Sequence, residues 1–336
     1  MAKPFTTLDD VAKAAGMSRA QVSRALRGDP GVRPETRERI DAIAAHLNYR
    51  PNLAARSLAE SRSSIVGLII GDPNNPFHIQ LAQAVDRHLL AAGFDAITSL
   101  RSVDDGAALQ EVERLLSLRA AGIILLGSAH HPKVIGEIAD KLPCVFIGSK
   151  RVAHPEVISI AVDDDSGVRL AMEHLYGLGH RRIAHLAGGR EPSSKERANA
   201  YSRFMREAGL EPVLIRGKHN AAFGRAGVDA LFASQTPPTA IFASNDFIAL
   251  GVLDRLKGMG LSVPSDVSVV GFDDIPDAAN ALFSLTTLKQ DTEAQAKAAV
   301  ESLRTILAGT AARKRRVDMS AELIVRTSTA APALSQ

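Results

Sequence analysis

The chain has 336 residues, 46% of them hydrophobic, which is enough to bury a large core and indicates two or three folding units. Its single cysteine, Cys144, excludes a disulfide framework and any site with several cysteine ligands, and it is typical of the reducing cytoplasm, where we expect the protein. No apolar run approaches the ~18 residues of a membrane span, and the N-terminus lacks the apolar core of a secretory signal.

The net charge of +3 is unevenly distributed along the chain. Residues 1–62 hold eleven Lys and Arg against seven Asp and Glu, so this segment carries +4 and the remainder carries −1. A basic segment on a nearly neutral body favours a polyanionic partner for that segment. A solvated helical surface is the alternative explanation of the same balance.

The segment that starts at Thr7 has the signature of a helix N-terminus. The Thr7 hydroxyl can accept from the free N–H groups of the first turn, and Asp9 and Asp10 favour the positive end of the helix dipole. Gly16 provides the positive φ that ends such a helix. Ser18 is then placed to cap a second helix over Arg19–Leu26.

The spacing of small and apolar residues in these two helices predicts a helix-turn-helix. Ala12 allows the helices to approach closely, Gly16 lies in the turn, and Val22 faces inward to lock the second helix on the first. A third helix over Pro34–Leu47 would close this small core. An ordinary helical hairpin is the alternative.

A short helix-competent segment follows at 49–58. Pro51 and Asn52 can start a helix, but so short a helix is far below the ~12–15 residues needed for independent stability. Such a segment can fold when DNA and a partner subunit are present and unfold otherwise. Leu58, apolar at its far end, suits a wedge between base steps in the minor groove.

From Ser64 onward, short β-rich runs alternate with amphipathic helices, which predicts parallel sheets with helices on both faces. One sheet of all these strands would be unusually wide, so we expect two Rossmann-like lobes, at roughly 64–161 and 162–290. A late helix over Thr292–Ala308 and a strand-like run over Glu322–Arg326 complete this body. The predicted strands are Ile65–Ile70, Ala96–Ser99, Gly122–Leu126, Cys144–Ile147, Ile158–Val162, Ile183–Ala187, Val213–Arg216, Ala240–Ala243 and Val267–Phe272.

The sequence lacks the common motifs of catalysis. There is no Walker motif, and the Gly188-Gly189 pair is not a dinucleotide fingerprint. His174, His180 and His185 do not share one helical face, which disfavours a metal site. Ser194 and Ser244 lack the Gly-x-Ser-x-Gly elbow. We therefore expect no catalytic residues, no metal and no cofactor.

Polar side chains follow several of the predicted strands. In parallel α/β sheets ligands bind beyond the carboxyl ends of the strands, and carboxylates, amides and an aromatic face suit a polyol in a cleft between two lobes. Asn245 and Asp246 could equally cap the helix that follows them. The residues that the strand-end rule selects are Asp72, Ser128, Ser149, His219, Asn245, Asp246 and Asp273.

A series of short motifs runs in order along the chain: Thr7-Leu8-Asp9-Asp10-Val11-Ala12, Gly16-Met17-Ser18, Val22-Ser23-Arg24-Ala25-Leu26, Asn48-Tyr49-Arg50-Pro51-Asn52, Asn75-Pro76-Phe77, Gly179-His180-Arg181-Arg182-Ile183, Asn245-Asp246, Gly271-Phe272-Asp273-Asp274 and Leu285-Thr286-Thr287. With these motifs the chain resembles the lactose-repressor (LacI/GalR) family over essentially its whole length. The resemblance implies a dimer with one recognition helix in each major groove, hinge helices in the central minor groove, and a two-lobed sensor similar to periplasmic binding proteins.

The resemblance also implies roles for residues that match its motifs in the head. Base contacts fall to Arg19, Ala20 and Arg24, and Arg24 suits a bidentate pair with guanine. Gln21 and Arg27 depart from the usual Thr and Asn, so the operator would differ at flanking positions. Phosphate contacts fall to Thr7, Ser18, Ser23 and Asn52, and hinge contacts to Ala55 and Leu58.

In the sensor, the resemblance implies that Phe77 stacks on the effector, that His219 stands where an aromatic wall residue is common, and that polar contacts come from Ser193, Arg197, Asn245 and Asp273. Three positions depart from the family pattern, namely Ala121 for Asp, Ala200 for Gly and Phe223 for a small residue. Phe223 lies close to His219 in sequence, so the identity of the effector stays open.

These observations predict an all-α helix-turn-helix head at 1–48, a hinge and linker at 49–62, and a two-lobed effector-binding and dimerisation domain at 63–336. The expected function is that of a transcriptional repressor that binds double-stranded operator DNA as a homodimer. Its effector would be a sugar, sugar acid or polyol, with a purine as second choice. A sugar-binding protein would lack the head, and an α/β enzyme would need catalytic residues. Only 11 residues follow Val325 and form no apolar heptad, so we expect no tetramerising coiled coil.

Overall fold

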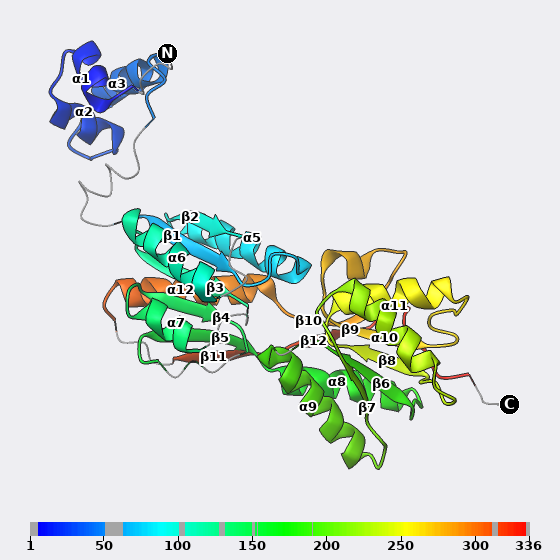
Figure 1. The fold of residues 1–336 in the computed structure, drawn as a ribbon. Helices are drawn as coiled ribbons and strands as arrows, with labels where there is room; N and C mark the ends of the chain where they lie inside the picture. Colours follow the sequence, from blue (N-terminus) through cyan, green and yellow to red (C-terminus); the bar gives the residue numbers. More distant parts are fainter. Residues whose placement is uncertain are drawn as a thin grey trace. The chain divides into compact units, whose positions relative to one another are not determined.

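The computed structural model describes residues 6–50, 63–100, 105–127, 132–149, 152, 154–189, 191–310 and 315–333. The chain divides into two compact units, residues 1–63 and 64–336 (Figure 1). The first unit is all-helical in its described part, and the second consists of two α/β lobes, each with a six-stranded sheet. This confirms the predicted fold class.

The first unit contains α1 (Leu8–Ala15), α2 (Arg19–Leu26) and α3 (Pro34–His46). As predicted, Thr7 caps α1: its Oγ1 accepts from the Asp10 N–H, and the Asp10 carboxylate accepts from the Thr7 N–H at 2.8 Å. Ser18 caps α2 through the same reciprocal pattern. The three helices share a core in which Val11, Val22 and Ile40 are fully buried.

The first lobe has the strand order β11-β5-β4-β3-β1-β2, and all its strand pairs are parallel. Every residue of β1 is buried, as a strand covered on both faces requires. Helices α5 and α12 cover one face and α6 and α7 the other. The bounds are β1 Ile65–Ile70, α5 Pro76–Ala91, β2 Asp95–Ser99, α6 Asp105–Ser117, β3 Gly122–Leu126, α7 Pro132–Ala139, β4 Cys144–Ile147, β5 Val157–Val162, α12 Thr292–Leu307 and β11 Arg316–Met319.

The second lobe has the order β12-β10-β9-β8-β6-β7, and β12 is antiparallel to β10. Helices α8 and α9 pack on one face of this sheet and α10 and α11 on the other. The bounds are α8 Asp164–Gly177, β6 Ile183–Ala187, α9 Pro192–Glu207, β7 Val213–Arg216, α10 Ala221–Phe232, β8 Ala240–Ala243, α11 Asp246–Gly258, β9 Ser268–Asp273, the 3-10 helix η1 Pro276–Ala279, β10 Thr286–Lys289 and β12 Glu322–Ile324.

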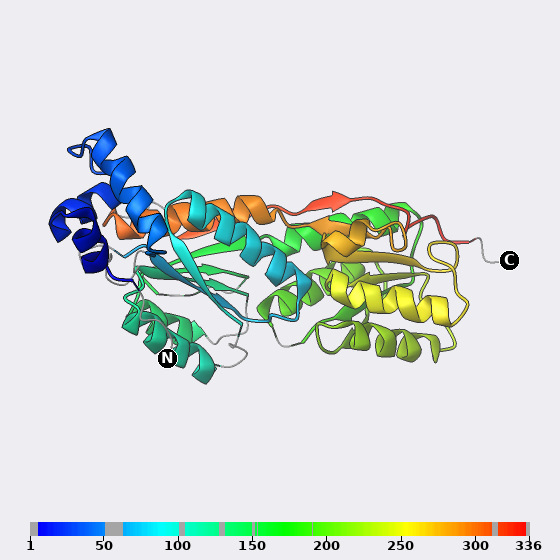
Figure 2. The same cartoon turned by 90° about the horizontal axis from the view of Figure 1, so that it is seen from above.

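The chain crosses between the two lobes at three places in its described part: after β5, after β10 and after β11. Helix α12 and strand β11 therefore return to the first lobe, and Figure 2 shows the orange α12 beside the cyan α5. The sequence prediction had placed the lobes at roughly 64–161 and 162–290 and had assigned the late helix and the last strand to neither of them. Strands β10 and β11 were not predicted. Among the described residues, no helix has both the length and the apolar character that a membrane span requires.

Candidate functional site

Helix α2 presents the predicted base-reading residues on the surface of the first unit. Arg19, Ala20 and Arg24 are all exposed. Two of them form ion pairs within the unit: Arg19 Nη1 lies 3.4 Å from Asp9 Oδ2, and Arg24 Nε lies 3.5 Å from Asp29 Oδ2. The guanidinium groups are thus held near the helix and remain accessible to a partner.

The hydroxyls predicted to bind phosphate have local partners. Thr7 and Ser18 cap α1 and α2, so both lie at helix N-termini, where anions are favoured. Ser23 Oγ accepts from Arg27 Nη1 at 3.0 Å. The other three predicted contacts, Asn52, Ala55 and Leu58, lie outside the described residues.

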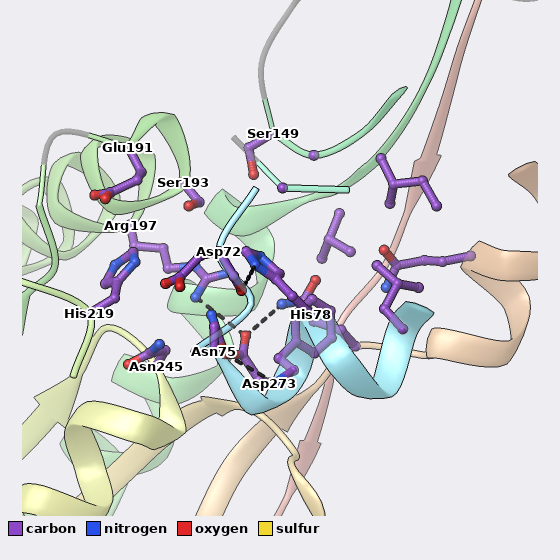
Figure 3. Close-up of a pocket in the computed structure, with 18 residues that line it drawn as sticks. Asp72, Asn75, His78, Ser149, Glu191, Ser193, Arg197, His219, Asn245 and Asp273 are labelled. Carbon is purple, nitrogen blue, oxygen red and sulfur yellow. Dashed lines mark hydrogen bonds and ion pairs between the residues drawn. The ribbon is translucent and has the colours of Figure 1, made fainter. Parts of the chain in front are cut away.

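A cleft between the two lobes of the second unit holds about 770 Å³ of empty space, its open mouth included. Figure 3 shows Asp72, Asn75 and His78 reaching it from the first lobe, and Arg197 and His219 reaching it from the second. All six residues that the sequence predicted to bind an effector line this one cleft. The lining residues are Asp72, Asn75, Phe77, His78, Leu81, Gly127, Ile147, Gly148, Ser149, Val162, Glu191, Ser193, Arg197, His219, Asn245, Asp273, Gln290 and Gln295.

Arg197 is the centre of a buried network in this cleft. Its Nε donates to Asp164 Oδ1 at 2.7 Å, and its Nη1 donates to the Ser244 carbonyl at 2.6 Å. Asp164 accepts a second bond from Ser149 Oγ at 2.6 Å. Because Ser149 follows β4 in the first lobe while Arg197 lies on α9 in the second, Asp164 joins the two lobes at the cleft.

Asp273 ends β9 beneath the same guanidinium. Its Oδ1 lies 3.7 Å from Arg197 Nη1 and accepts from Gln290 Nε2 at 2.6 Å. Burial raises the pKa of Asp273 to about 8, although the Arg197 charge acts in the opposite direction. Its φ of 125° is rare for a residue with a side chain. Strain and burial of this kind gather at functional sites.

The two residues for which the sequence left a capping role open behave differently. Asn245 Oδ1 caps α11 by accepting from the Ile248 N–H at 2.9 Å, while its Nδ2 is buried without a partner in the described residues. Asp246 accepts from Thr287 Oγ1 at 2.5 Å and from the Ile275 N–H at 2.9 Å. Asn245 therefore keeps a donor for the cleft, whereas Asp246 holds the surrounding loops together.

Two histidines add uncharged rings to the cleft. His219 Nε2 lies 2.6 Å from Ser194 Oγ, and burial lowers its pKa to about 4. His78 Nδ1 lies 3.1 Å from the Asp72 carbonyl, and burial also lowers its pKa. The ring of Phe77 lies 6.0 Å from that of His78. The cleft thus combines aromatic surface with neutral nitrogen atoms.

Three buried polar atoms of the lining have no partner among the described residues: Glu191 Oε2, Asn245 Nδ2 and Gln295 Nε2. Unpaired buried polar atoms are costly and therefore rare. One acceptor and two donors of this kind indicate a ligand with both hydroxyl donors and oxygen acceptors.

Sequence reasoning did not select Asn75, His78, Glu191, Gln290 or Gln295. Gln290 directly follows β10, so the strand-end rule would have found it had that strand been predicted. His78 lies one residue after Phe77 on the first turn of α5. Gln295 comes from α12, whose assignment to the first lobe has no sequence signal. Of the residues that the rule did select, Ser128 lies outside the described residues.

Comparison with known proteins gives consistent matches over the whole chain. Residues 7–52 match the model of the lacI family of bacterial regulatory proteins, and residues 172–329 match a periplasmic binding protein-like domain. The lactose operon repressor of Escherichia coli is 30% identical over 98% of this chain and 92% of its own length. The ribose operon repressor of Bacillus subtilis is 32% identical over 89% of this chain and 91% of its own length. The crystal structure of the Lac repressor dimer bound to operator and the anti-inducer ONPF superposes with a TM-score of 0.85 at 30% identity, covering 98% of this chain and 100% of that one. The chain belongs to the LacI family of bacterial transcriptional regulators, which bind DNA through their helix-turn-helix.

Proposed function

We propose that this regulator is a repressor that binds operator DNA through α2 and releases or tightens its hold when a sugar or related polyol enters the cleft. The observation that carries the proposal is the cleft itself. It is lined from both lobes, contains the strained and buried Asp273, and leaves three buried polar atoms without a partner among the described residues.

The charge of the described lining favours a neutral ligand over a sugar acid. Arg197 is its permanent cation, and the buried Asp164 offsets that charge at 2.7 Å. Asp72 and Glu191 add carboxyl groups, and both histidines stay neutral because burial lowers their pKa. An anion would therefore meet no uncompensated positive charge among these described groups.

The polar and aromatic groups suit a hydroxylated ring. Arg197 can take ligand hydroxyls through charge-assisted bonds, each worth about 1.5–3 kcal/mol. Asp273, whose pKa burial raises to about 8, can both donate to and accept from a hydroxyl as a protonated carboxyl. Phe77, which is 7% exposed, offers an apolar face. A purine would use the rings of Phe77, His78 and His219 but fewer of the hydroxyl partners.

The regulatory step requires that the ligand bind two arrangements of the lobes unequally, because a ligand shifts an equilibrium only by its difference in affinity. The cleft meets this requirement since its contacts come from both lobes, and Ser149 and Asp164 form a bond between them. A change in lobe spacing would reach the DNA through the hinge at 49–62.

We further propose a homodimer that acts in the cytoplasm. The related Lac repressor structure is a dimer bound to operator. A dimer of this chain would place two copies of α2 on a palindromic site, one helical turn of DNA or a multiple of it apart.

Two measurements test the proposal. Thermal-shift screening should find stabilisation by a neutral sugar or polyol and not by sugar acids or purines. Duplexes that the protein selects from a random pool are then titrated with and without that ligand. Asp273→Ala should bind the duplex normally, lose at least about tenfold in ligand affinity, and no longer respond at ligand concentrations that act on the wild type. A response that persists in Asp273→Ala would make Asp273 a structural residue, and stabilisation by a sugar acid alone would refute the neutral ligand.

A sugar-binding protein without DNA affinity and an α/β enzyme are the other classes that the second unit could represent. Selection from the random pool separates both from a regulator, because neither would enrich any duplex.

A further inference from the structure

The turn after α2 returns the main chain over the last turn of the helix. The Asp29 N–H donates to the Arg24 carbonyl at 3.1 Å, and the Gly28 N–H donates to the Ala25 carbonyl at 2.9 Å. Gly28 has a φ of 78°, which glycine adopts without the steric cost of a Cβ atom. These two bonds form the Schellman arrangement of a helix C-terminus and fix the main chain of Asp29 beside Arg24.

The side chains follow from this backbone. Asp29 Oδ2 lies 3.5 Å from Arg24 Nε and accepts from Arg27 Nη2 at 3.2 Å. A Cβ atom on Gly31 would lie 2.8 Å from Arg24 Nη2. The Arg24 guanidinium therefore lies between the Asp29 carboxylate and the Gly31 main chain.

The contact with Asp29 uses the inner nitrogen of Arg24. Within the described part of the chain, no hydrogen bond engages Nη1 or Nη2 of this residue, and the Arg24 side chain is 54% exposed. Bidentate recognition of guanine needs two parallel nitrogens directed at the O6 and N7 atoms. An arginine held at Nε presents these two nitrogens in a restricted orientation, so its side chain loses less conformational entropy on binding.

We propose that Asp29 is a positioning residue that confers base specificity on Arg24 and weakens the binding of unrelated DNA. Its carboxylate orients the guanidinium towards a guanine edge and, at the same time, places a negative charge near the backbone phosphates. This rests on the proposed function, in which Arg24 contacts DNA.

The two effects act in the same direction on specificity. On random DNA, Arg24 would pair with a phosphate, a contact without sequence information that must compete with Asp29 for the guanidinium. The carboxylate also repels every duplex, because phosphate charge dominates non-specific affinity. On the selected site, the bidentate guanine contact offsets this repulsion. Asp29 stays ionised at neutral pH, since the hydrogen bond from Arg27 lowers its pKa.

The test compares the full chain with variants that change either the charge or the geometry at Arg24. Asp29→Asn removes the charge but keeps the main-chain bond from Arg37 Nη2 to the Asp29 carbonyl. Gly31→Ala changes no charge, and its methyl group would displace only the flexible end of Arg24. Asp41→Asn, at an exposed position on α3, is the charge control.

Affinities are measured by fluorescence anisotropy for the selected duplex, for a scrambled duplex, and for all single base-pair substitutions of the selected site. Asp29→Asn should lower the ratio of specific to random affinity about tenfold, with weaker discrimination at the base pair that Arg24→Ala identifies. Gly31→Ala should weaken discrimination at that same base pair. Asp41→Asn should leave the ratio within about twofold.

Two results would overturn the proposal: an equal change of both affinities in Asp29→Asn, or unchanged discrimination in Gly31→Ala. Arg24→Ala distinguishes failure of the positioning role of Asp29 from failure of the proposed function. If Arg24→Ala leaves base preference intact, Arg24 does not read the operator at all. If Arg24→Ala loses that preference while Asp29→Asn keeps it, only the positioning role of Asp29 fails.

Discussion

Asp164→Asn tests how much stability comes from the buried Asp164, which pairs with Arg197 within the second lobe and accepts from Ser149 of the first. Asp164 is 2% exposed and accepts from both Ser149 and Arg197. An asparagine amide keeps one acceptor oxygen but turns an NH₂ group towards the other donor. It also removes the negative charge from beside a guanidinium whose side chain is 6% exposed.

The expected loss of unfolding free energy depends on how much negative charge remains near Arg197 in the variant. Removing one partner of a buried ion pair costs about 3–5 kcal/mol, because the remaining charge is left uncompensated. Here Asp273 lies 3.7 Å from Arg197 and can supply part of the lost charge once its own carboxyl ionises. The loss should therefore lie near the lower end, at about 3 kcal/mol of unfolding free energy. The Asp164 charge also raises the pKa of Asp273, so this pKa should fall in the variant.

The assay is urea unfolding followed by circular dichroism, since the chain has no tryptophan. Asp165→Asn is the matched control. It removes the same charge at the next residue, where Asp165 forms an exposed ion pair with Arg203. Such a surface pair contributes about 0–1 kcal/mol. If the two variants lose the same stability, the reasoning about the buried bridge is refuted.

Three further predictions concern DNA binding and pH. Arg24→Ala should lose about 1–3 kcal/mol on the selected duplex while thermal stability and ligand binding stay unchanged, and equal losses on scrambled DNA would reduce Arg24 to a phosphate contact. A dimer that neutralises about 6–10 phosphates should lose about 10³–10⁵ in affinity between roughly 50 and 200 mM salt, whereas a flat response would contradict a polyanion partner. Burial raises the pKa of Asp273 from 3.8 to about 8, so its contribution to stability is complete below the lower value and is lost as pH rises towards the upper one. Asp273→Asn should therefore flatten the pH dependence of the unfolding free energy over this window, and an unchanged slope would show that Asp273 does not titrate there.

The sequence predicted helices and strands well where residues close in sequence determine them. The caps at Thr7 and Ser18 placed α1 and α2, because a cap acts within one helical turn. Strands such as β1 and β3 were predicted with their correct bounds, since an apolar run of that length suits a buried strand.

Non-local pairing explains what was missed. Strand β11 (Arg316–Met319) alternates charged and apolar residues and lies at the sheet edge beside β5, a partner from much earlier in the sequence. Strand β10 is only four residues long and carries two threonines. The partners of Arg197 likewise come together only in the folded chain, so no spacing rule could have found the bridge to Asp164.

The three crossings between the lobes have a consequence for how the molecule is made. The first lobe needs β11 and α12, which the ribosome delivers only after the whole run from β6 to β10 has emerged. During synthesis, the DNA-binding unit is therefore attached to a sensor that stays incomplete until α12 and β11 have been made. A truncation before Thr292 would remove α12, which packs against α5. It would therefore damage the first lobe, although most of that lobe lies far upstream in the sequence.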